Sequence, residues 1–198
     1  MSQKRSEIDP KVLLEASIRV ERDLSIMTGP ELMARYSGPD HAMVFQHVTG
    51  RPVAEVAVDH NPFWHYALQT WYKRPQYRAL LHPPRHRDEI AKTILMMALG
   101  ELDSYDGIHL QYPRRALKSF FAKMACDWLP KRHKIMEDLD ILILYSHNLE
   151  TRATRALESI KNMNRRNRYI LKHFGDGCVS MTGAPVMPQV SSTTLSEL

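Results

Sequence analysis

Lys118 and Ser119 end a short basic stretch, PRRALKS at residues 113–119, whose residue types suit a phosphate-binding loop. In such a loop, a tight turn between a strand and a helix directs backbone N–H groups at phosphate oxygens. The lysine then reaches the β- and γ-phosphates of a nucleotide, and the hydroxyl that follows it binds Mg²⁺. The stretch therefore predicts ATP and Mg²⁺ as ligands, with Lys118 on the phosphates and Ser119 on the metal.

The stretch departs from the usual pattern of a phosphate-binding loop in two places. Leu117 stands where a glycine normally precedes the lysine, and Tyr112 and Pro113 stand where the loop normally starts with glycine. Leucine adopts a positive φ only with strain. The residues alone therefore leave a second interpretation open, in which the stretch is a basic turn between a strand and a helix.

A second group of basic residues crowds the segment 152–172, where only Glu158 interrupts it. Such a helix face is commonly just solvated, but it can also contact the DNA backbone or dock a partner. Backbone contacts of this kind are independent of sequence and sensitive to salt. The residues predicted to bind nucleic acid are Arg152, Arg155, Arg165, Arg166 and Arg168.

The composition is that of a protein with a sizeable core. The chain has 198 residues, of which 43% are hydrophobic and 25% charged, and its net charge of +5 suits a polyanionic partner. No apolar run approaches the roughly 18 residues that cross a bilayer, so we expect no membrane partner. The first residues lack the apolar stretch of a secretory signal. Cys126 and Cys178 stand in no metal-ligand spacing, and we expect free thiols in a reducing compartment.

The elements that would position these residues fall into three regions. Residues 1–80 are expected to be a helical appendage, with a helix over 10–24 and then short pieces that Gly-Pro pairs interrupt. Residues 81–176 are expected to alternate helices and strands, and the tail 177–198 is expected to be irregular. The elements predicted for the middle region are a helix from about 87, a strand at 107–112, a helix over 119–129 that Pro130 ends, a strand at 141–145, and one long helix from Ser146 or Asn148 to the stop at Gly175.

The connections between the two expected strands are long enough for a parallel sheet. The predicted fold class is therefore α/β: an incomplete, parallel-sheet nucleotide-binding core of the P-loop type, with a helical N-terminal appendage.

The order of motifs over about residues 80–176 resembles the N-terminal ATPase region of viral large terminases, the motors that package DNA into bacteriophage proheads. The motifs that carry the resemblance are a histidine-bearing turn and helix (HPPRHRDEIAKTILMMALGE), the deviant loop PRRALKS, a helix with a late tryptophan (FFAKMACDWL), the strand and turn ILILYSHN, and the closing NRRNRYILKHFGD.

The resemblance implies ATP binding by the deviant loop. It implies that Arg114, four residues before the lysine, senses the γ-phosphate, and a guanidinium there would stabilise charge on the transferred group. Arg115 is a further expected nucleotide contact. The implied partners are DNA, a portal, a small terminase subunit and other copies of the chain in a ring, and the implied location is the host cytoplasm.

No apolar strand ending in Asp-Glu, the Walker B element of such ATPases, occurs in the chain. We therefore expect this chain alone to hydrolyse ATP poorly if at all. The alternative function is of another class: a non-enzymatic, basic nucleic-acid-binding or virion-assembly protein whose nucleotide loop is vestigial.

Overall fold

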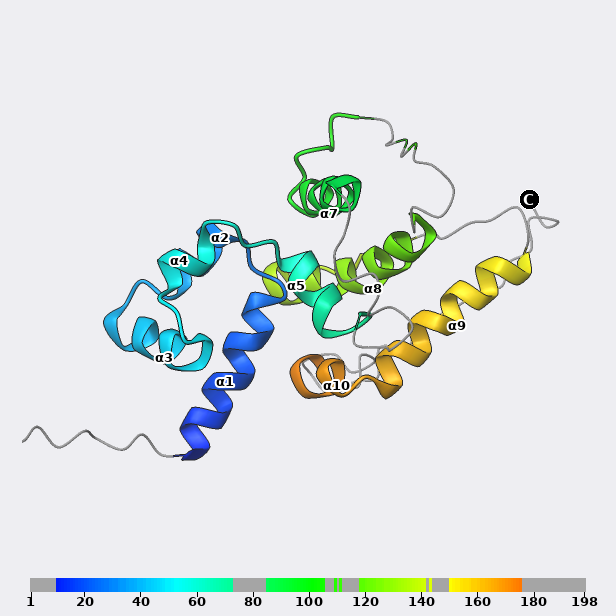
Figure 1. Cartoon of the computed structure of the whole chain (residues 1–198). Coiled ribbons are helices and arrows are strands. Elements are labelled where there is room, and N and C mark those ends of the chain that lie inside the picture. Colours follow the sequence, from blue (N-terminus) through cyan, green and yellow to red (C-terminus); the bar gives the residue numbers. More distant parts are fainter. Residues whose placement is uncertain are drawn as a thin grey trace, which may run out of the picture.

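The computed structural model describes residues 10–72, 85–105, 109, 111, 118–141, 143 and 150–175. Within these residues the chain is helical and contains no strand (Figure 1). The helices are α1 (Pro10–Leu24), α2 (Gly29–Arg35), α3 (Pro39–Thr49), α4 (Val53–Ala57), α5 (Pro62–Gln69), α7 (Arg85–Ala98), α8 (Lys118–Glu137), α9 (Glu150–Arg166) and α10 (Arg168–Phe174).

The predicted α/β fold is wrong, because the structure is all-helical where it is described. Of the two expected strands, the described residues 109, 111, 141 and 143 lie in no strand, and the others fall outside the described residues. A short apolar run such as ILIL does not by itself distinguish a strand from other buried structure. Here the apolar faces of α5, α7, α8 and α9 cover one another, so no sheet is needed to bury them.

The helices α1 to α4 enclose a first core cluster. The predicted helix over 10–24 is confirmed, and Val20 and Leu24 bury its inner face against Ile26, Leu32 and Phe45. Thr28 begins α2 with a reciprocal cap, in which its backbone N–H donates to Glu31 Oε2 at 2.6 Å. At Gly29, α2 lies so close to α4 that a Cβ atom would collide with the carbonyl of Ala57.

The helices α5, α7, α8, α9 and α10 enclose a second core cluster, which is rich in aromatic rings. Trp128 is fully buried and meets Phe63 edge to face, with the ring centroids 5.3 Å apart. The other large members of this cluster are Tyr66, Trp71, Tyr72, Ile90, Phe120, Phe121, Met124, Met163 and Ile170.

The helix predicted over 119–129 is longer than expected, because α8 continues through Pro130 to Glu137. Proline supplies no N–H for the helix ladder and usually ends or kinks a helix. Contacts beyond Pro130 compensate for the missing hydrogen bond. The buried guanidinium of Arg132 donates to the carbonyl of Ile26 and forms an ion pair with Glu31 at 3.0 Å. These contacts fasten the second half of α8 to the loop after α1 and to α2.

The long helix predicted to end at Gly175 is in fact two helices that meet at Asn167. The Asn167 side-chain oxygen accepts the N–H groups of Tyr169 at 2.9 Å and Ile170 at 3.2 Å, so it caps α10. Its amide nitrogen donates to the carbonyl of Thr70 at 3.2 Å, which ties the junction to the end of α5. The predicted stop is confirmed, since Gly175 follows α10 with φ of 77°.

Candidate nucleic-acid interface

The residues of the predicted phosphate loop are only partly described. Arg114 and Arg115 lie outside the described residues, with the rest of the stretch 112–117. Lys118 is the first residue of α8, and Ser119 follows it with an exposed side chain. The prediction that a helix starts here is confirmed, but the strand that should precede it is absent at the described positions 109 and 111.

The five arginines predicted to bind nucleic acid all have exposed side chains. Four of them lie on α9, which buries Met163 in the second core cluster and also buries Ala156. Arg155 and Arg166 are eleven residues apart, which is about three turns, so they share one face about 16 Å apart along the axis. Figure 1 shows α9 at the opposite side of the molecule from α3 and α4. The structure therefore exposes all five arginines, and it places Arg155 and Arg166 on the same face of α9.

Positive charge is concentrated on α9 and α10. The segment 150–174 has seven basic and two acidic side chains, hence a net charge of +5. The whole chain also carries +5, so all its other residues together are neutral. Among the side chains that the structure describes, no carboxylate forms an ion pair with any of the five arginines. We call the exposed cations of 152–172 the basic face, and no described carboxylate is paired with its arginines, so their positive charges add to one electrostatic potential.

A buried carboxylate holds α9 against α8 and α5. Asp127 of α8 is 2% exposed, and its Oδ1 accepts the side-chain amide of Asn164 at 2.7 Å. The other donors to its carboxylate are Tyr66 Oη at 2.7 Å, Trp71 Nε1 at 3.1 Å and Lys131 Nζ at 2.6 Å. Burial raises the pKa of Tyr66, and the Asp127 charge raises it further, so the phenol remains a donor.

Two buried rings fix the rotation of α10 against α1. The Tyr169 hydroxyl donates to the carbonyl of Glu21 at 2.8 Å, and it therefore accepts from Ser25 Oγ at 2.6 Å. Burial raises the pKa of Tyr169, which keeps this hydroxyl protonated. His173 Nδ1 lies 3.1 Å from the carbonyl of Ile18. With these rings turned inward, Arg168 and Lys172 remain exposed beside α9.

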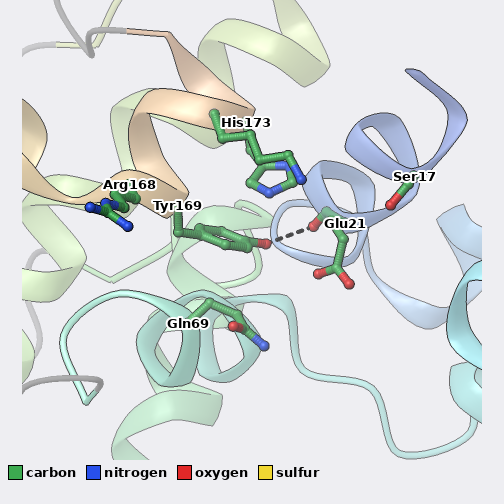
Figure 2. Close-up of a pocket in the computed structure, with 7 residues that line it drawn as sticks. Ser17, Glu21, Gln69, Arg168, Tyr169 and His173 are labelled. Carbon is green, nitrogen blue, oxygen red and sulfur yellow. Dashed lines mark hydrogen bonds between the residues drawn. The ribbon is translucent and has the colours of Figure 1, made fainter. Parts of the chain in front are cut away.

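A pocket of about 350 Å³ opens between α1, α5 and α10 (Figure 2). It was not predicted from the sequence, because its walls come from three segments far apart along the chain. The only local signal is the four-residue spacing of its residues on α1 and on α10, which places each pair on one helix face. The lining residues are Ser17, Glu21, Gln69, Arg168, Tyr169, Lys172 and His173.

The part of the chain that the structure describes contains no group of three or more His, Cys, Asp or Glu side chains that could hold a metal ion. None of the described helices is both long enough and apolar enough to cross a membrane. Comparisons with protein-family models, with curated proteins and with solved structures find no match to this chain.

Proposed function

We propose that this protein binds the phosphate backbone of DNA, without sequence preference, through the basic face on α9 and α10. The observation that carries the proposal is the segregation of charge, since residues 150–174 hold a net charge of +5 on an otherwise neutral chain. A helix surface that only contacts solvent does not require such an excess of basic over acidic side chains. Arginine suits phosphate in particular, because its planar guanidinium donates two parallel hydrogen bonds.

The anchoring of α9 and α10 supports the proposal as well. Asn164 and Asn167 fasten the two helices to buried groups of α8 and α5, so the arginine backbones are held in place before any ligand arrives. The backbone of such a face needs no ordering on binding, so only the side chains of the arginines lose conformational entropy.

The proposal is tested by fluorescence anisotropy with two labelled duplexes of equal length and unrelated sequence. We expect equal affinities within about threefold, because phosphate contacts carry no sequence information. The logarithm of the binding constant should fall linearly with the logarithm of salt concentration, with a slope of about −4.5 to −6.3 for five to seven contacts. A slope near zero, or strong preference for one duplex, would contradict backbone binding.

Binding of ATP and Mg²⁺ at Lys118 and Ser119 remains a second candidate function. In a helical setting it would depend on the N–H groups in the first turn of α8, a helix of 20 residues, and on the exposed Ser119 hydroxyl. The terminase resemblance suggests this candidate, along with a portal, a small subunit and ring assembly as partners, but the α/β fold that it also implied is not the fold of the described residues. Titration of a fluorescent ATP analogue with Mg²⁺ should show at least tenfold weaker binding for Lys118→Ala; identical curves for the two proteins would exclude it.

A further inference from the structure

The pocket between α1, α5 and α10 shares two of its residues with the basic face. Arg168 and Lys172 are one helical turn apart on α10, are both exposed, and both line the pocket. Two cations at this spacing can contact the same phosphate group, with arginine as the directional donor and lysine as a mobile point charge. This end of the pocket therefore suits an anion.

The other end of the pocket suits a hydrogen-bond donor. Figure 2 shows Glu21 at the hydroxyl end of Tyr169, whereas Arg168 lies beyond the opposite end of the ring. The Glu21 side chain is 34% exposed, and one of its oxygens lies 3.6 Å from His65 Nε2. A carboxylate has about four lone-pair sites, so it can accept further hydrogen bonds from a ligand. Gln69, on the third wall, adds an amide that both donates and accepts.

The pocket is therefore electrically asymmetric, with cations at one end, a carboxylate at the other and an aromatic wall between them. The pocket is open to solvent, and its volume of about 350 Å³ lies near the lower end of the range of small-molecule sites. A nucleotide has the matching asymmetry, because its phosphate is anionic and the edge of its base carries donors. Guanine fits a carboxylate best, since its N1–H and its amino group lie side by side and both donate. Thymine has no amino group, and two carbonyls flank its single N–H.

We propose that this pocket binds one nucleotide, with its phosphate on Arg168 and Lys172 and an amino-bearing base, guanine above all, on Glu21. The nucleotide is either the unpaired end of a DNA strand or a free mononucleotide. This proposal rests on the proposed function, since Arg168 would serve both surfaces, and it adds a preference that backbone binding alone does not have.

The test is calorimetric titration of the full chain with dGMP and with dTMP. We expect saturable binding of dGMP at least tenfold tighter than that of dTMP. Lys172→Ala should weaken both nucleotides, whereas Glu21→Gln should remove most of the preference for dGMP, because an amide accepts only through one of its two ends. Arg51→Ala, which removes an exposed cation between α3 and α4, should change neither. Gln69→Ala offers a second variant with weakened binding if Glu21→Gln unfolds the protein.

Competition distinguishes the two sources of the nucleotide. Two 5′-phosphorylated single strands are compared, one with dG and one with dT as its 5′-terminal nucleotide. If the dG strand displaces dGMP more effectively than the dT strand does, the ligand is a strand end. If neither strand displaces dGMP, the ligand is a free mononucleotide. Either outcome supports nucleotide binding in the pocket. Absent dGMP binding, equal affinity for dGMP and dTMP, or indifference to Glu21→Gln and Lys172→Ala would overturn it. Duplex binding with a steep salt slope would then still stand, so this failure is distinct from a failure of the basic face.

Discussion

Replacing Arg155 and Arg166 together by alanine is expected to weaken duplex binding on the order of 100-fold at about 50 mM salt. Both side chains are exposed on one face of α9, where no described carboxylate pairs with them. Each phosphate contact releases about one counterion from the DNA on binding. Without two of these contacts, the salt slope should become shallower by about 2 units. Anisotropy titrations of wild type and variant over a range of salt concentrations measure both quantities.

The matched control removes two positive charges elsewhere. Arg51→Ala/Lys92→Ala changes the net charge equally, at an exposed position between α3 and α4 and another on α7. We expect it to weaken binding less than about threefold and to leave the slope unchanged, because more distant charges act only through a screened field. Equal losses in the two double variants would mean that net charge, and not the basic face, determines binding.

Asp127→Ala is expected to lower the free energy of unfolding by about 3–5 kcal/mol, the usual cost of breaking a buried charge pair. The substitution leaves Lys131, whose side chain is 12% exposed, without its carboxylate partner. It also deprives the buried donors of Tyr66, Trp71 and Asn164 of their shared acceptor. Urea denaturation followed by circular dichroism measures the change.

Asp59→Ala serves as the control for this prediction, because Asp59 is exposed between α4 and α5. It should change the free energy of unfolding by no more than about 0.5 kcal/mol. Asn164→Ala removes a single hydrogen bond to Asp127, so an intermediate loss of about 1–3 kcal/mol is expected. An Asp127→Ala protein as stable as Asp59→Ala would show that the carboxylate does not hold α5, α8 and α9 together.

The parts of the fold that the sequence predicts well are those that local chemistry determines. The helix over 10–24 follows from its apolar spacing, and the stop at Gly175 follows from the left-handed backbone that glycine permits. The extension of α8 through Pro130 could not be predicted, because it depends on Arg132 reaching Ile26 and Glu31, about 100 residues away in sequence. The sheet was wrongly predicted because a short apolar run fits either a strand or another buried segment.

In the candidate site, too, the sequence predicts the features that depend on local chemistry and misses those that depend on contacts between distant segments. The arginines of α9 were expected on the surface, since unpaired guanidinium groups are rarely buried, and they lie there. The break at Asn167 turns Arg168 and Lys172 toward the pocket. It could not be predicted, because the helical spacing of apolar residues continues across Asn167. The pocket itself requires α1 to meet α10 through the bonds of Tyr169 and His173, which link residues about 150 positions apart.

The central claim is that DNA is bound by the basic face of α9 and α10, and amide chemical-shift mapping tests it most directly. Isotope-labelled protein is titrated with a short duplex of arbitrary sequence at low salt. The account predicts that the largest shifts fall within residues 152–172 and reverse when salt is added. Shifts centred instead on α2, α3 or α4, or no shifts at a DNA concentration well above that of the protein, would contradict it.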